Sequence, residues 1–426
     1  MIMITLRLSL MMFLQFFIWG GWFVTLGTYL SNTLQANGGQ IGMAFSTQSW
    51  GAIIAPFIIG LIADRFFNAE KILGILHIVG AVLMFFMYQA DSFSSFYPYV
   101  LAYMIAYMPT LALVNSVSFG QMDDPSKQFG KVRVWGTVGW IVAGLMISYA
   151  FSWDSAQSIA DGMLKNTFLL CSIASLALGI FSFTLPNTPP QASGQKVTLR
   201  DILGLDALAL LKDKNFFVFF LSSVLICIPL AFYYQNANPF LTEIGVENAT
   251  GKMTLGQVSE VLFMLALPIF LNRFGIKATL VIGMAAWVIR YTLFAFGNAD
   301  EGLFMLIVGI ALHGICYDFF FVSGQIYTNA KAGENIKSAA QGLITLATYG
   351  VGMLVGFAVA GAITDTYTLD GGSHSWQQVW LFPAGFAAVV LVVFALLFKK
   401  RKGKRRCIIL QEENFFKVWR LLAQVC

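Results

Sequence analysis

One stretch decides how this chain folds: residues 60–71 read GLIADRFFNAEK and form a charged bend between two long apolar runs. Asp64 and Arg65 stand where one membrane helix should end, and Lys71 stands where the next should begin. A weaker version of the bend returns about two hundred residues later, where residues 268–277 read PIFLNRFGIK. Two related bends at matching places predict a chain built from two related halves, an organisation typical of secondary transporters.

The composition indicates that most of the chain lies in lipid. Of its 426 residues, 58% are hydrophobic and only 11% are charged, and the mean hydropathy is +0.74. A soluble protein carries about 25% charged residues, so this deficit is too large for an ordinary globular core. We therefore predict an all-α integral membrane protein whose surroundings are the lipid bilayer. The net charge of +5 is no sign of a nucleic acid polymer as partner, because the placement of the basic residues explains it.

Apolar runs of about 20 residues, enough to cross about 30 Å of hydrocarbon, recur about twelve times. Their centres lie near Trp19, Gly51, Val79, Ala106, Ile141, Ser175, Cys227, Met264, Ala286, His313, Tyr349 and Val389. Six runs precede a polar stretch and six follow it. This predicts an N-terminal six-helix bundle at 1–185, a cytoplasmic linker at 186–214, a C-terminal six-helix bundle at 215–400 and a basic cytoplasmic tail at 401–426.

The positive charges fix the expected orientation. If the N-terminus is cytoplasmic, the outer loops hold only Lys165 and Lys252 as basic residues. The inner loops hold Arg65, Lys71, Lys127, Lys131, Lys196, Arg200, Lys212, Lys214, Arg273, Lys277, Lys331 and Lys337. This asymmetry is what the positive-inside rule requires. We expect a monomer in the cell inner membrane with both termini in the cytoplasm.

Four charged residues lie within apolar runs: Arg133, Glu260, Arg290 and Asp318. A charge at the centre of a membrane helix costs about 2.5–3.5 kcal/mol on insertion scales, so such residues usually have a functional or structural role. Arg290 is best interpreted as having a structural partner or as reaching toward the membrane surface. The other three are candidates for a site within the membrane.

Helical spacing sorts the polar and aromatic residues into stripes, because positions three, four and seven apart share one face of a helix. The stripes are Arg133, Thr137 and Trp140 on the fifth helix, Gln257 and Glu260 on the eighth, and His313 and Tyr317 on the tenth. Facing one another, they would line a wet cavity near the midplane of the membrane. Rings for stacking, together with hydrogen-bonding groups, suit a small polar ligand with a flat ring. A nucleoside fits this description, and a sugar fits it less specifically.

The charged bend at 60–71 resembles the loop of the major facilitator superfamily, whose pattern is roughly G-x-L-A-D-R-x-G-x-[KR], although Phe67 stands where the family usually has glycine. Six further motifs together resemble the bacterial nucleoside:proton symporters of that superfamily. They read FLQF at 13–16, YMPT at 107–110, RVWGT at 133–137, QVSE at 257–260, AWVIR at 286–290 and YDFF at 317–320. The resemblance runs from about residue 8 to residue 400.

This resemblance implies twelve transmembrane helices that take up nucleosides with protons. The binding positions of the family carry over to Arg133, Thr137, Gln257, Glu260 and Asp318. Trp140 and Tyr317 stand where the family often has Phe, which keeps a stacking role, and His313 stands where Tyr is common. The seventh helix departs most, because its residues 232–236 read FYYQN and do not align cleanly with the Gln and Asn of the family.

Glu260 and Asp318 are the two candidates for the proton carrier, since a carboxyl in a low-dielectric cavity tends to hold its proton. The alternative for both is a structural ion pair. Asp318 lies about 140° around its helix from His313, off the ligand stripe by the 3.6-residue period. Asp64 and Arg65 are expected to latch the inner ends of helices rather than to touch substrate.

Three interpretations remain open on the sequence. The first is a nucleoside:proton symporter working by alternating access, and the second is a proton-coupled symporter of sugars or another small polar solute. The third is a receptor or scaffold that uses a transporter fold without transport. Catalysis is not expected, because the sequence has no phosphate-binding Gly-Lys loop, no cluster typical of metal ligands and no nucleophile–base pair. No cofactor is expected beyond the coupling proton.

Overall fold

The computed structural model describes residues 2–58, 67–189, 205–333 and 336–399. Asp64 and Arg65, most of the predicted linker and the predicted tail lie outside these residues, so the roles given to them stay predictions. Every element of regular structure in the described part is a helix, apart from one isolated bridge between Thr368 and His374.

The helices fall into a first half, before the linker, and a second half, after it. The first half contains α1 (Ile2–Phe23), α2 (Leu26–Asn32), α3 (Gly38–Ile58), α5 (Ala69–Gln89), α6 (Phe93–Phe119), α7 (Pro125–Leu145), η2 (Met146–Ala150), α8 (Ala156–Ala160), η3 (Met163–Lys165) and α9 (Asn166–Ser182). The second half contains η4 (Leu205–Lys212), α11 (Lys214–Glu243), α12 (Ala249–Phe296), α13 (Leu303–Ala311), α14 (His313–Cys316), η5 (Tyr317–Val322), α15 (Ser323–Ala332), α16 (Lys337–Thr345), η6 (Leu346–Gly352), α17 (Met353–Thr366) and α18 (Trp376–Leu397).

The number of membrane passes follows from α12. Eleven helical segments in the described residues are long and apolar enough to cross a membrane, and α12 is the longest of them. Its 48 residues would extend about 70 Å if straight, more than twice the hydrocarbon thickness. Gly275 breaks it with φ 76° and ψ 170°, a conformation that glycine adopts without strain. The two arms of α12 are therefore separate passes, which makes twelve, as predicted.

Within each half the helices approach closely. In the first half α1 packs along α7, and α5 packs against α6 and α9; in the second half α12 packs on α18, and α11 on α17. Gly139 permits the contact of α7 with α1, because a Cβ there would lie 2.2 Å from the carbonyl oxygen of Phe13. Small residues at such contacts are how helices pack in lipid, where the hydrophobic effect between helices is absent.

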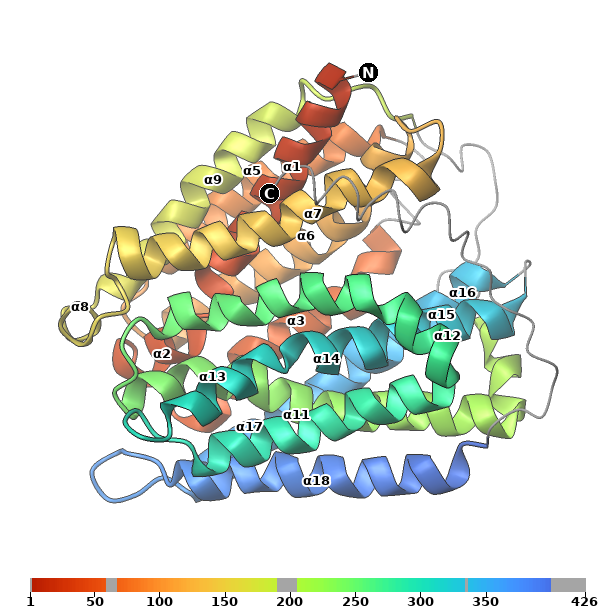
Figure 1. Ribbon diagram of the computed structural model, residues 1–426. Coiled ribbons are helices and arrows are strands. Elements are labelled where there is room, and N and C mark those ends of the chain that lie inside the picture. Colours follow the sequence, from red (N-terminus) through yellow and green to blue (C-terminus); the bar gives the residue numbers. More distant parts are fainter. Residues whose placement is uncertain (1, 59–66, 190–204, 334–335, 400–426) are drawn as a thin grey trace, which may run out of the picture.

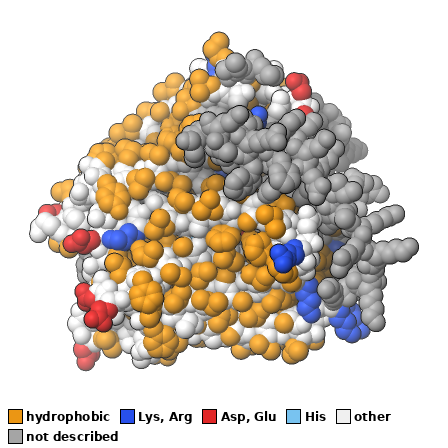
Figure 2. Space-filling model, in the orientation of Figure 1, with side chains coloured by type: hydrophobic (Ala, Val, Ile, Leu, Met, Phe, Trp, Pro, Cys, Tyr) orange, Lys and Arg blue, Asp and Glu red, His pale blue; other side chains and the backbone are white. Residues whose placement is uncertain are grey.

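The surface is that of a protein in lipid. Large apolar side chains point outward from several helices, with Ile173, Leu262 and Val389 each more than 60% exposed. Figure 2 shows these side chains covering the visible face, while acidic side chains gather at the end that carries α8. Most of the visible lysine and arginine side chains lie toward the opposite end. In water such a face would be a large aggregation-prone patch, whereas in a bilayer it is the expected boundary.

The two halves are joined at the end that carries α8, here called the α8 end (Figure 1). Asp365, in the last turn of α17, accepts hydrogen bonds from the backbone N–H groups of Gly38 (2.6 Å) and Gly39 (2.8 Å), the first residues of α3. Asp154, after η2, accepts one from the N–H of Thr250 (3.0 Å), in the first turn of α12. Each half therefore supplies an aspartate that caps a helix N-terminus of the other half, where a negative charge is most favourable.

Three other hydrogen bonds join the halves, and they lie at the same end. Thr28 donates to Asn238 (2.6 Å), the N–H of Gly251 donates to Ser148 (2.7 Å), and the side chain of Gln235 reaches the carbonyl of Gly38 (3.4 Å). Among the described residues, no hydrogen bond between the halves lies elsewhere. Figure 1 shows the helices of the two halves diverging from this end toward the end that carries α15.

Candidate functional site

A cavity of about 120 Å³ lies between the two halves. Helices α1, α3 and α7 form one wall, and α11, α12, α14, η5 and η6 form the other. The lining residues are Phe16, Trp19, Phe23, Gln48, Arg133, Gly136, Thr137, Trp140, Tyr234, Gln257, Glu260, His313, Tyr317 and Tyr349. The cavity thus combines many aromatic rings with a few polar and charged groups, the composition typical of small-molecule sites.

The seven residues that the sequence predicted as substrate contacts all line this one cavity: Arg133, Thr137, Trp140, Gln257, Glu260, His313 and Tyr317. The three helical stripes therefore do face one another across the halves. Asp318 is not among the lining residues, in keeping with its position off the stripe. The bend residues Asp64 and Arg65 lie outside the described part.

The first-half wall is an aromatic cluster around one guanidinium. Arg133 lies over the ring of Phe16, with 4.2 Å from its guanidinium carbon to the ring centre. Gly136, one turn further along α7, leaves room for this fold-back, because a Cβ there would lie 2.8 Å from an Arg133 nitrogen. Trp19 meets Trp140 edge to face, with ring centres 5.6 Å apart. No carboxylate of the described residues pairs with this guanidinium, which cation–π attraction holds over the Phe16 ring.

The second-half wall is organised by hydrogen bonds between side chains. Tyr317 and Tyr349 share a hydrogen bond of 2.7 Å between their hydroxyl groups. Both tyrosines lie in π-helical turns, η5 and η6, where an extra residue per turn changes the direction of side chains. Such turns inside membrane helices often occur at functional sites.

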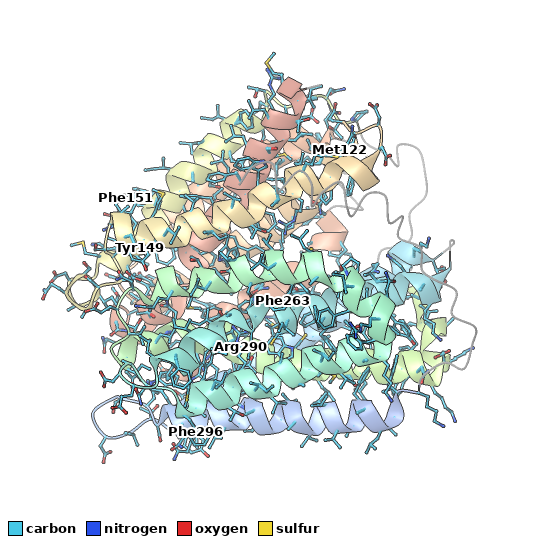
Figure 3. The ribbon with its side chains drawn as sticks, in the orientation of Figure 1. Met122, Tyr149, Phe151, Phe263, Arg290 and Phe296 are labelled. Atoms are coloured by element: carbon cyan, nitrogen blue, oxygen red, sulfur yellow. The ribbon has the colours of Figure 1, made fainter. Side chains whose placement is uncertain are left out.

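The orientation of the His313 ring is set by Arg290, another residue of the second half. Arg290 lies 3.1 Å from Nδ1 of His313, and because a guanidinium only donates, Nδ1 must accept. The proton of the neutral ring is then on Nε2. Arg290 itself is fully buried and lies 3.5 Å from the ring centre of Tyr233. Figure 3 places it within the second half. Of the two roles expected for Arg290, the structural partner is the one observed.

The cavity holds opposite charges on opposite walls. Arg133 belongs to the first half and Glu260 to the second, and both line the cavity. The described residues form no ion pair between these two within 4.0 Å. In this conformation the two charged groups are therefore not paired with each other, and a ligand between them could contact both.

Asp318 lies in a different environment. Its side chain is fully buried in η5, and neither carboxylate oxygen has a hydrogen-bond partner among the described residues. Burying a charge without a partner is expensive, and adding a proton removes that cost. Asp318 is thus a buried acid next in sequence to the cavity residue Tyr317.

Several lining residues were missed by the sequence reasoning. Gln48 is 2% exposed, and its side-chain oxygen has no partner in the described structure. It carried the same signal as the polar residues that were chosen, an amide within an apolar run. The aromatic residues Phe16, Trp19, Phe23, Tyr234 and Tyr349 carried no such signal, because the chain has 40 Phe, 10 Trp and 14 Tyr.

The structure also accounts for Gln15, an amide in the first apolar run, and for the polar residues of the seventh helix. The side chain of Gln15 joins Thr110 (2.7 Å) and His77 (2.8 Å), so it ties α1 to α5 and α6 and is not among the cavity-lining residues. In the divergent seventh helix, Asn236 donates to Thr364 on α17 (3.0 Å), and Tyr234 is the residue that lines the cavity. The seventh helix thus presents an aromatic ring to the cavity and uses Asn236 for packing.

Comparison with known proteins now identifies the family. The sequence profile of the family described as nucleoside H⁺ symporter matches residues 2–403. This chain belongs to that family. It is 45% identical to the putative nucleoside transporter YegT of Escherichia coli (strain K12) over 96% of this chain and 97% of that protein. It is 32% identical to the nucleoside permease NupG of the same organism, over 92% and 96% of the two chains.

The fold agrees with this family. A crystal structure of the nucleoside transporter NupG superposes with a TM-score of 0.84 at 32% identity, covering 93% of this chain and 100% of that chain. A crystal structure of a NupG mutant gives a TM-score of 0.86 over the same shares. Xanthosine permease of Escherichia coli (strain K12) is 35% identical over 93% of this chain and 96% of that protein. The chain is therefore a multi-pass membrane transporter of the major facilitator type, not an enzyme.

Proposed function

We propose that this protein imports nucleosides together with protons by alternating access, and that the cavity between the halves is the substrate site. The observation that carries this proposal is the pairing of stacking rings with polar groups across the cavity. Trp140 and Tyr317 lie on opposite walls, and so do Arg133 and Glu260. A ligand held by both walls links the positions of the two halves, which is what alternating access requires.

We assign roles by the chemistry of each side chain. Trp140 and Tyr317 stack on the base, which offers a flat face to aromatic rings. Arg133 and the Nε2–H of His313 donate hydrogen bonds, Glu260 accepts them, and Gln257 and Thr137 can do both. The Tyr317–Tyr349 hydrogen bond holds the stacking ring in place.

The size of the cavity supports movement during the cycle. At about 120 Å³ it is smaller than the roughly 300–1,000 Å³ of typical ligand pockets. A nucleoside would therefore need the walls to separate further than they do in this conformation.

The proton is proposed to be carried by Glu260 or Asp318. Glu260 can exchange a proton within the cavity, whereas Asp318 would carry one without touching substrate. If substrate and proton both favour the same closed state, binding of one strengthens binding of the other, which is the thermodynamic basis of symport.

The placement of charge supports the proposed orientation. With both termini in the cytoplasm of a bacterial cell, the α8 end with its acidic side chains faces outward. The hydrogen bonds that join the halves then close the protein on its outer side, and the conformation described here faces inward. We further propose that one chain is sufficient for transport, because the cavity walls come from the two halves of a single chain.

Uptake into proteoliposomes tests this proposal. Labelled uridine and adenosine are supplied with an inward proton gradient, and then with a protonophore. Accumulation that collapses with the protonophore is the expected result. Absence of nucleoside uptake by folded protein would refute the proposed substrate and direct the next trial to sugars. Ligand binding without any transport would instead favour the receptor interpretation.

A further inference from the structure

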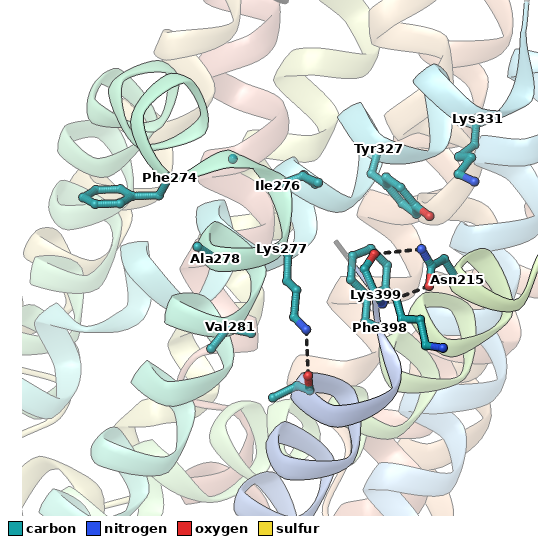
Figure 4. Close-up of a pocket in the computed structure, with 12 residues that line it drawn as sticks. Asn215, Phe274, Ile276, Lys277, Ala278, Val281, Tyr327, Lys331, Phe398 and Lys399 are labelled. Carbon is teal, nitrogen blue, oxygen red and sulfur yellow. Dashed lines mark hydrogen bonds between the residues drawn. The ribbon is translucent and has the colours of Figure 1, made fainter. Parts of the chain in front are cut away.

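The second charged bend of the sequence, at 268–277, borders a hollow of about 520 Å³ that is separate from the substrate cavity. It lies where α12 turns at Gly275, beside α15, the start of α11 and the end of α18. Figure 4 shows lysine side chains from three of these segments around it. None of its lining residues lines the cavity between the halves.

The rim of the hollow is basic. Lys277 donates to the carbonyl of Ala395 (2.7 Å) near the end of α18, which leaves two of its three ammonium hydrogens for another partner. Lys331 forms an ion pair of 2.6 Å with Asp213. The ammonium of Lys399 is exposed and has no partner among the described residues.

Asp213 neutralises only part of this charge. It pairs with Lys331 and also accepts a hydrogen bond from the N–H of Phe216 at the start of α11. The Lys331 ammonium and this N–H lower the pKa of Asp213 from its ordinary value, so the carboxylate is charged at neutral pH. Within the described part of the chain one acid is thus set against three lysines, which gives the rim a net positive charge.

The walls of the hollow are mostly carbon. Phe274, Val281, Tyr327 and Phe398 line it, and Phe274 is 44% exposed. The end of α18 beside it continues with exposed apolar side chains, such as Leu396 at 74%. A small inorganic anion would use the lysines but would gain nothing from these walls. A molecule with an anionic group and a hydrocarbon chain uses both.

We propose that this hollow binds an anionic phospholipid, with the phosphate among Lys277, Lys331 and Lys399 and an acyl chain along Phe274 and Val281. Such a lipid would join the second arm of α12 to α15 and to the end of α18. The chain's own residues 400–406 read KRKGKRR, and their charge would be repelled by the same lysines. The tail is therefore the less suitable occupant.

Binding of defined lipids to the purified full-length protein tests the proposal by native mass spectrometry in detergent. Dioleoyl phosphatidylglycerol is the probe, and dioleoyl phosphatidylcholine is the neutral comparison. At about 1 kcal/mol per lysine near a membrane surface, Lys399→Gln should weaken phosphatidylglycerol binding about fivefold. The triple variant with Lys277→Gln and Lys331→Gln added should weaken it roughly a hundredfold.

A matched control carries the same change of charge elsewhere. Lys71, Lys131 and Lys165 are exposed and do not line the hollow, so their triple change to Gln should leave binding within twofold. The side chain of Lys399 forms no hydrogen bond or ion pair with the described residues, and Lys399→Gln therefore tests the proposal even if the triple variant does not fold.

Three results would overturn the inference. The first is equal binding of the charged and the neutral lipid, and the second is an unchanged affinity in Lys399→Gln. The third is displacement of the lipid by glycerol phosphate at equal concentration, which would indicate a site for free anions. Nucleoside uptake is not the readout, so this test can fail while the proposed function stands.

Discussion

Removing the Asp365 carboxylate should open the α8 end. In Asp365→Ala, the N–H groups of Gly38 and Gly39 lose the acceptor that the other half supplies. A hydrogen bond to a charged group contributes about 1.5–3 kcal/mol, and a charge at a helix N-terminus adds about 0.3–1 kcal/mol. Because Asp365 is exposed, water replaces part of this interaction. We therefore expect a loss at the low end, about 1.5–2 kcal/mol for the pair of bonds together.

This loss converts into a change of populations. At 1.4 kcal/mol for each factor of ten, the equilibrium should move roughly ten- to thirtyfold toward the state that is open at the α8 end. Asp365→Asn should give an intermediate shift, because the amide oxygen still accepts a hydrogen bond but the charge is gone.

Electron–electron distance measurements read the shift directly. Nitroxide labels at Gln157 and Glu301 report on the α8 end, since both residues are exposed and belong to different halves. Cys407 and Cys426 are first replaced by serine, while the cysteines at 171, 227 and 316 are buried and stay. The variant should gain a population at longer distance.

The control is Asp370→Ala. Asp370 is an exposed acid five residues further along the chain, and its side chain accepts no hydrogen bond among the described residues. It should leave the distance distribution unchanged. If Asp365→Ala leaves the distribution unchanged as well, or if both variants shift it equally, the carboxylate does not hold the halves together.

Three further outcomes are expected. Glu260→Gln should abolish uphill accumulation in proteoliposomes but leave nucleoside exchange; unaltered accumulation would exclude Glu260 as the coupling acid. Gly139→Ala should lower the free energy of unfolding by about 1–3 kcal/mol through overpacking against α1, measured as thermal unfolding in detergent. Gly130→Ala is its control, because a Cβ there meets no atom within 4 Å, and an equal loss in both would disprove the packing argument. Tyr349→Phe removes the hydroxyl that contacts Tyr317 and should raise the KM for nucleoside about two- to tenfold; an unchanged KM would mean that the bond does not position the ring.

The sequence predicted the fold because lipid imposes a simple rule. Each pass needs about 20 apolar residues, and the bend at Gly275 was visible as a charged break between two such runs. The π-helical turns η5 and η6 were not predicted, since no residue pattern in the chain marks where an extra residue enters a helical turn. The domain boundaries and the latch role of Asp64 and Arg65 stay predictions.

The candidate site was only partly predictable. Polar residues in apolar runs stand out, so Arg133 and Glu260 could be chosen from the sequence and were found on facing walls. Periodicity gives the face of one helix but not its neighbours, so the sequence could only suggest that the three stripes face one another, and the structure places them around one cavity. Aromatic lining residues such as Trp19 could not be separated from the many that face lipid or the helix contacts. Gln48 could have been found in the same way, because it is an amide within an apolar run.

Because of the reciprocal caps, closure of the α8 end and recognition of the substrate depend on different residues. Evolution can therefore change one of these properties without the other. Asp154 and Asp365 bind backbone N–H groups, which every residue except proline possesses. Closure therefore needs small residues where the halves meet, since a Cβ at Gly38 would lie 2.7 Å from the carbonyl oxygen of Gly361, but it needs no particular side-chain chemistry in the first turn of α3. The walls around Trp140 and His313 can vary in turn without weakening it. Paralogues with different substrates could thus inherit one closing device unchanged and diverge only in what they recognise.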